Sequence, residues 1–103
     1  MNVQLLEKWR DDLRTTTEKQ GKWQLGNSER GFCCLGRLCV VTGEAFEPRQ
    51  TGPSFAQPIA NDFYNSLISD TFAPIGWNDS LDMTFQEIAD ILDIILIDPE
   101  ILT

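Results

Sequence analysis

Histidine, the side chain that most often serves as a general base near neutral pH, does not occur in this chain of 103 residues. The chain also lacks a glycine-rich phosphate loop and the other common catalytic motifs. Sixteen acidic residues provide carboxylate pairs by chance, and no pair stands out. We therefore expect a protein that is not an enzyme and that uses no cofactor.

Lysine and arginine are absent after Arg49. Residues 50–103 contain nine acids and no base, whereas residues 1–49 contain eight bases and seven acids, and the net charge is −8. Binding nucleic acid by charge requires a cationic footprint, so we expect no direct nucleic-acid binding. Ordinary surfaces mix both signs of charge. The asymmetry therefore indicates a partner with a basic surface, with solubility as the simpler alternative.

Long hydrophobic runs and a disulfide pattern are also missing. Apolar runs such as residues 94–97 are far shorter than the roughly 18 to 20 residues of a membrane span, and no signal peptide is recognisable. Three cysteines, Cys33, Cys34 and Cys39, are an odd number without the spacing of a zinc site. We expect no membrane association, no bound metal, a cytoplasmic location and reduced, buried thiols.

The apolar periodicity predicts helices over residues 3–15, over 34–41 with Gly43 as the C-cap, and from about Pro58. Thr84 and Glu87 form a capping box for a last helix that ends at Asp98. A small hairpin is expected from strands at 22–25 and 32–34, and residues 71–77 are expected to be irregular or a short strand.

These elements predict one α+β domain, residues 1–103, in which two to three helices pack on a short hairpin beside a long Pro/Gly loop at about 43–58. The first and last helices should form most of the core. The predicted core residues are Leu6, Trp9, Leu13, Leu35, Leu38, Phe63, Leu67, Phe85, Ile88, Leu92 and Ile95.

Two candidate sites follow from the charges. An acidic face for a basic partner would consist of Asp79, Asp82, Asp90 and Asp93, since Glu87 and Asp98 are explained by helix ends. The alternative is a ligand-binding protein, such as a sponge for a nucleotide signal. Its basic residues would be Arg10, Arg14, Lys22, Arg30 and Arg37. The apolar tail, residues 94–102, is also rich enough to bury against a second copy in a homodimer.

Several blocks of the chain resemble a family of small phage, prophage and bacterial proteins. The resemblance is carried by Trp9, Leu13, Gln20, Gly21, Leu25, the block Phe-Cys-Cys-Leu-Gly-x-Leu-Cys at 32–39, Asn78, Asp79 and the terminal block at 84–91. This chain departs from the pattern at Arg37, Val40 and Val41, and residues 43–76 are unmatched. The family has no secure activity, so no catalytic residue is transferred.

That resemblance implies association with phages, whose small acidic accessory proteins are often counter-defence factors, anti-CRISPR proteins among them. It leads us to expect an inhibitor or modulator of a host protein, such as a nuclease or a CRISPR effector. If the protein is phage-encoded, the expected location is the cytoplasm of the host cell.

Overall fold

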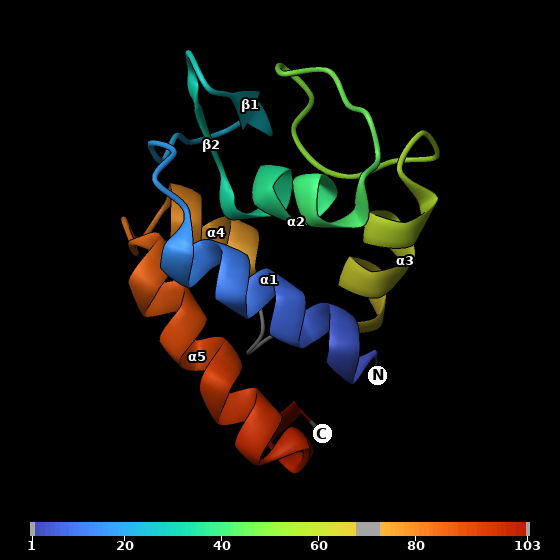
Figure 1. Ribbon diagram of the computed structural model, residues 1–103, viewed down its shortest axis with the longest axis vertical. Helices are drawn as coiled ribbons and strands as arrows, with labels where there is room; N and C mark the ends of the chain where they lie inside the picture. The colour runs from blue at the N-terminus through green and yellow to red at the C-terminus, as the bar shows by residue number, and fades with distance from the viewer. Residues whose placement is uncertain (1, 68–72, 103) are drawn as a thin grey trace.

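The computed structural model describes residues 2–67 and 73–102 and shows a small α+β fold (Figure 1). Within those residues there are five α-helices, a two-stranded antiparallel hairpin and a terminal 3₁₀-helix. In chain order they are α1 (Val3–Thr15), β1 (Gly26–Asn27), β2 (Gly31–Phe32), α2 (Cys34–Thr42), α3 (Pro58–Leu67), α4 (Pro74–Asp79), α5 (Phe85–Ile97) and η1 (Pro99–Leu102). The α+β class is confirmed, but five helices replace the predicted two or three.

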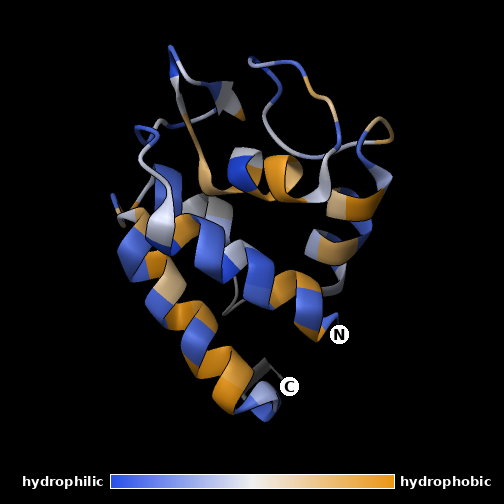
Figure 2. Cartoon of the chain, viewed as in Figure 1, coloured by the Kyte–Doolittle hydropathy of each residue, from blue (hydrophilic) through white to orange (hydrophobic). Residues whose placement is uncertain are grey.

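Helices α1 and α5 lie side by side and carry much of the core (Figure 1). The side chain of Asn2 accepts a hydrogen bond from Leu5 N at 3.0 Å and caps α1. The predicted capping box of Thr84 and Glu87 is present at the start of α5. The buried residues of α1 and α5 belong to one hydrophobic core, and Figure 2 shows apolar and polar residues alternating along both helices. All eleven predicted core residues are buried, each with at most 7% of its surface exposed.

The first strand of the hairpin lies later in the chain than predicted, whereas the second overlaps the predicted strand at Phe32. The strands are Gly26–Asn27 and Gly31–Phe32, whereas residues 22–25 are irregular. The pairing requires glycine, because Gly26 has φ +85° and a Cβ there would lie 1.8 Å from the carbonyl oxygen of Gly31. The expectation of a strand at 22–25 was therefore wrong.

The long loop, residues 43–57, is held in place by hydrogen bonds. Leu25 N donates to Gln50 O at 2.6 Å, and Gly26 N donates to Pro48 O at 2.8 Å, so the loop pairs with the chain at the start of β1. The buried Gln57 donates from Nε2 to Ala45 O at 2.8 Å. Phe55 is nevertheless 99% exposed in this loop.

Glu44 joins the start of the loop to α3. Its carboxylate accepts hydrogen bonds from the backbone N–H groups of Ile59 and Ala60, both at 2.8 Å, at the end where a helix has unpaired donors. Burial opposes ionisation of this carboxyl, but the bonds from Thr42, Ala60 and Ile59 hold the pKa of Glu44 below its ordinary value. The predicted helix start near Pro58 is confirmed.

Helix α4 was not predicted, because the segment is short and contains both proline and glycine. Pro74 occupies the first helical position, where a missing N–H removes no helical hydrogen bond. Trp77 therefore lies in a helix and not in an irregular segment or strand. Thr71 and Phe72, which belong to the same expectation, lie outside the described residues.

Candidate functional site at Trp23 and Asp79

A buried hydrogen-bond network connects α1, α2 and α4 below the candidate site. The indole Nε1 of Trp9 donates to Cys34 O at 2.9 Å, and Cys34 N donates to Asn78 Oδ1 at 3.3 Å. Asn78, which is fully buried, donates from Nδ2 to Gly21 O at 2.8 Å. Because buried amides are stable only when paired, Asn78 fixes the chain at Gly21 against α4.

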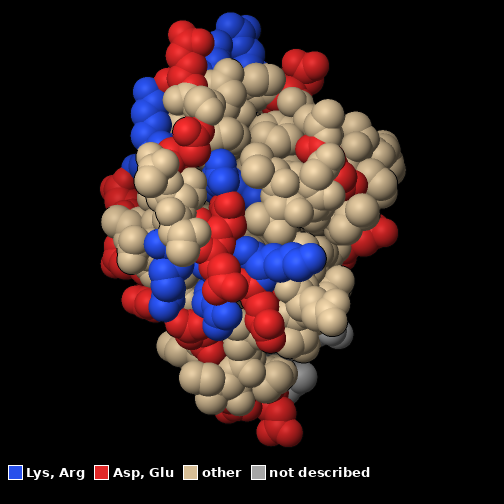
Figure 3. Space-filling model, in the orientation of Figure 1, with Lys and Arg blue, Asp and Glu red and all other residues tan. Residues whose placement is uncertain are grey.

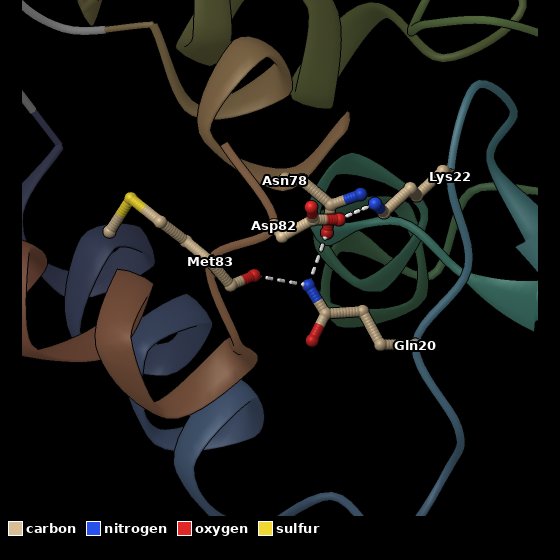
Figure 4. A pocket seen from close by; sticks show the side chains of 5 residues that line it. All are labelled: Gln20, Lys22, Asn78, Asp82 and Met83. Atoms are coloured by element: carbon tan, nitrogen blue, oxygen red, sulfur yellow. Dashed lines mark hydrogen bonds and ion pairs between the residues drawn. The ribbon is translucent and has the colours of Figure 1, made fainter. Parts of the chain in front are cut away.

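Gln20 extends this network to the start of α5. Its Nε2 donates to Asn78 Oδ1 and to Met83 O, both at 2.7 Å (Figure 4). Its Oε1 accepts from Phe85 N at 2.9 Å. Gln20, Asn78 and Phe85 are therefore neighbours in space, although they are far apart in sequence. Their common role in this structure is to hold the loop before the hairpin against α2, α4 and α5.

A first hollow, of about 200 Å³, lies beside this network and is lined by Gln20, Lys22, Asn78, Asp82 and Met83. Figure 4 shows Lys22 and Asp82 pointing toward one another across it, as an ion pair. The polar groups of Gln20 and Asn78 already have partners within the chain. This hollow therefore offers few free groups to a ligand.

Trp23 stands beside this pair and is unusual in two respects. Its side chain is 64% exposed, and its φ of +70° lies in the left-handed region that bulky residues rarely occupy. The conformation is held by a hydrogen bond of 3.0 Å from Trp23 N to Asp79 Oδ1. A large aromatic side chain is thus exposed to solvent, while the hydrogen bond to Asp79 fixes its backbone. Backbone strain of this kind is concentrated at functional sites.

Asp79, at the end of α4, is 6% exposed and uses one carboxylate oxygen for two bonds. Its Oδ1 accepts from Trp23 N and from Asn78 Nδ2, the latter at 2.8 Å. Its Oδ2 has no hydrogen-bond or ion-pair partner among the residues that the structure describes. A nearly buried carboxylate therefore retains one unused acceptor.

A second hollow, of about 330 Å³, is where Trp23 and Asp79 meet. Among the described residues, Thr51, Gly76 and Ser80 also line it. A Cβ added at Gly76 would meet no atom within 4 Å, so the space beside this lining residue is open. We call these five residues the Trp23 surface.

The predicted acidic face is not a single free surface. Asp90 and Asp93 lie against α1, where Arg14 Nη2 is 2.8 Å from a carboxylate oxygen of each and Arg10 Nη1 is 2.7 Å from Asp93 Oδ1. Figure 3 shows basic and acidic side chains interleaved over this region. The other two predicted residues, Asp79 and Asp82, belong to the Trp23 region, the first buried and the second paired with Lys22.

The alternative basic site does not assemble either. Arg10 and Arg14 are engaged with the acids of α5, and Lys22 with Asp82. Arg37 is buried, bonds Asp12 through Nε at 2.8 Å and Nη2 at 2.7 Å, and lies over the ring of Phe32 at 4.8 Å. Arg30 is exposed in the hairpin turn. These five side chains do not converge on one pocket.

The pairing of Arg10 with Asp93 should contribute measurably to stability. The hydrogen bond from Arg10, opposed by burial and aided by Arg14, holds the pKa of Asp93 below its ordinary value. In a double-mutant cycle with Arg10→Met and Asp93→Asn, we expect a coupling of about 0.5–1 kcal/mol in urea unfolding at neutral pH.

The coupling energy between Arg10 and Asp93 should decrease as the pH falls. A depressed carboxyl pKa stabilises the fold above the unfolded value of about 3.9, and this contribution disappears as the pH falls through the folded value. The coupling should therefore be lost at about pH 2. A coupling that is zero at neutral pH, or unchanged in acid, would show that the crossing of α1 and α5 lacks this pair.

The three cysteines are free, buried thiols, as predicted. Burial raises the pKa of Cys33 from 9.0 to about 11 and that of Cys39 to about 12, and it raises the pKa of Cys34 well above its ordinary value. Near neutral pH these groups are protonated thiols and poor nucleophiles. Cys33 instead caps α2, because its Sγ accepts from Gly36 N at 3.4 Å.

Alkaline pH should destabilise the fold through these thiols. A raised folded pKa means that the stabilisation is complete below the unfolded value near 9 and is lost as the pH rises through the folded value. We expect the melting temperature to fall steeply between about pH 9 and pH 11. Cys39→Ala should show a shallower fall, although its stability at neutral pH is lower. Equal slopes for the two proteins would be evidence that Cys39 does not titrate on unfolding.

The described residues contain no group of three or more histidine, cysteine or acidic side chains that could hold a metal ion. Within the same part of the chain, no helix has the length and apolarity required to cross a membrane. Comparison with protein-family models, curated proteins and solved structures gave no significant match.

Proposed function

We propose that the protein is a non-enzymatic binding protein that docks onto a basic surface of a partner protein through the Trp23 surface. The observation that carries this proposal is Trp23 itself, a large apolar side chain that is 64% exposed and held in a rarely used backbone conformation. Folding does not need this arrangement, because the exposed ring buries little apolar area.

The exposed ring of Trp23 is suited to binding another protein. Tryptophan is enriched among the residues that dominate interface energies, since its ring buries a large area with little loss of conformational freedom. The bond from Trp23 N to Asp79 fixes the backbone beforehand, which lowers the entropy cost of docking. The adjoining hollow offers a place for one side chain of the partner.

The charge of the molecule supports a basic partner. The net charge is −8, so acids exceed bases two to one, and several of the bases are already engaged by acids of the same chain. An excess of negative potential accelerates association with a positive surface and is screened by salt. Asp90 and Asp93 contribute to this field, while the docking contact itself is assigned to Trp23 and Asp79.

The biological setting that we propose follows from the family resemblance alone: a phage-type accessory protein that inhibits or modulates a host defence protein, such as a nuclease or a CRISPR effector, in the host cytoplasm. The alternative of a sponge for a nucleotide signal is less favoured, because its five basic residues are dispersed or paired. A homodimer through the tail stays a prediction, for which the exposure of Ile94 and Ile97 on α5 is the only support among the described residues.

The proposal is tested by affinity capture from lysate of the candidate bacterial host at about 50 mM and about 500 mM salt. We compare the wild type with Trp23→Ala and with Phe55→Ala, a matched removal of another exposed aromatic side chain. A captured protein that is lost in Trp23→Ala, kept in Phe55→Ala and weakened by salt supports the proposal. Equal capture by both variants, or capture insensitive to salt, would refute it.

A further inference from the structure

We infer that the hollow between Trp23 and α4 accepts one arginine side chain of the basic partner, with its guanidinium bonded to Asp79 Oδ2 and stacked against the indole. This inference rests on the proposed function and specifies the contact at its centre. The hollow combines the two groups that recognise arginine best, a carboxylate and an aromatic face.

The free oxygen of Asp79 is the first argument. The side chain is 6% exposed and lines the hollow, and the two hydrogen bonds that it accepts both go to Oδ1. The unpaired Oδ2 is not among the fully buried atoms without a partner, so it reaches solvent and is open to a donor from outside, and charged donors give the strongest bonds to a carboxylate. Oδ2 is therefore positioned for a cationic donor that the described part of the chain does not supply.

Gly76 is the second argument. It lies within α4, where glycine is less favourable than alanine. Its φ is ordinary and no atom lies within 4 Å of where a Cβ would be, so neither conformation nor packing requires glycine there. Because glycine has no side chain, it leaves space in the hollow for a side chain of the partner.

The negative charge at the hollow disfavours an anionic ligand. The molecule carries −8, and Asp79 adds its carboxylate at the hollow itself, so a phosphate or an acidic peptide would be repelled. A volume of about 330 Å³ is at the lower end of small-molecule pockets, which favours a single side chain over a nucleotide.

The test uses the three tryptophan indole N–H signals in ¹⁵N NMR spectra of the whole protein, with the Trp23 signal assigned by its loss in Trp23→Phe. The protein is titrated with a blocked tripeptide that has arginine at its centre, and with analogues in which lysine, citrulline or glutamate replaces it. We expect the Trp23 signal to move with the arginine peptide at millimolar concentration. The lysine peptide should move it less, and the citrulline and glutamate peptides should leave it in place.

Two variants and one control decide the assignment. Asp79→Asn keeps an oxygen for Trp23 N but removes the charge, and it should weaken arginine binding about fivefold, as expected for one ion pair. Gly76→Leu fills the hollow and should abolish the shift, while the remaining signals report that the protein is folded. Asp62→Asn removes the same charge from an exposed position on α3 and should bind like the wild type.

An equal response to arginine and citrulline, or equal affinities of Asp79→Asn and Asp62→Asn, would overturn the inference. In either case, capture of a partner that still depends on Trp23 would leave the proposed function standing. A shift that follows these expectations without any captured partner would support the arginine site and count against the proposed function. The two proposals can therefore fail separately.

Discussion

Trp23→Gly is expected to make the protein more stable than Trp23→Ala by about 1 kcal/mol while both variants lose partner capture. At φ +70°, alanine keeps the strain caused by its Cβ, whereas glycine adopts this conformation freely. Both variants lose the same exposed ring, so their difference isolates the backbone. Urea unfolding of the two variants gives the difference directly.

This comparison separates a functional tryptophan from a structural one. If Trp23 were retained for packing, both variants would be several kcal/mol less stable than the wild type, as is typical for truncating a buried aromatic residue. We expect instead that the glycine variant matches or exceeds the stability of the wild type. A glycine variant that still captured the partner at wild-type affinity would show that the side chain is dispensable.

Gly36→Ala is expected to destabilise the fold by about 3 kcal/mol or more. A Cβ at this position in α2 would lie 2.0 Å from the carbonyl oxygen of Leu25, far inside contact distance. That carbonyl cannot retreat easily, because it accepts from Cys33 N at 3.2 Å while Leu25 N is bonded to Gln50 O. Helix α2 would therefore be forced away from the chain before the hairpin.

Gly52→Ala is the matched control for this change. It lies in the long loop, its φ is ordinary and nothing lies within 4 Å of a Cβ there. We expect its free energy of unfolding to stay within about 0.5 kcal/mol of the wild type. Thermal and urea unfolding compare the two variants. A Gly36→Ala protein as stable as Gly52→Ala would mean that α2 and Leu25 are not in contact.

The helices and the core were predictable because their signals are local. Apolar residues at helical spacing identified α1, α3 and α5, the pair of Thr84 and Glu87 located the start of α5, and Gly43 ended α2. The same stripes identified buried residues, since an amphipathic helix in a chain of this size has one core to face. The first strand of the hairpin was misplaced because glycine conformation, and not β-propensity, decides where the strands pair.

The candidate site was less predictable, because it depends on contacts between distant parts of the chain. Arg10 and Asp93 are 83 positions apart, and their pairing could not be seen in the sequence. The charge asymmetry of the two halves therefore suggested an external basic partner, although some acids of the second half pair with bases of the first. Asp79 was assigned to an acidic surface, although it is 6% exposed at the end of α4. Trp23 is not among the predicted site residues, because its positive φ has no signature in the sequence.

Hydrogen–deuterium exchange of the complex with the captured partner tests the central claim most directly. If the partner docks on the Trp23 surface, backbone amides at residues 20–25 and 76–82 should exchange more slowly in the complex, while those of α5 should be unchanged. Protection confined to residues 90–97 of α5, with none around Trp23, would contradict the account and restore the acidic face as the site of binding.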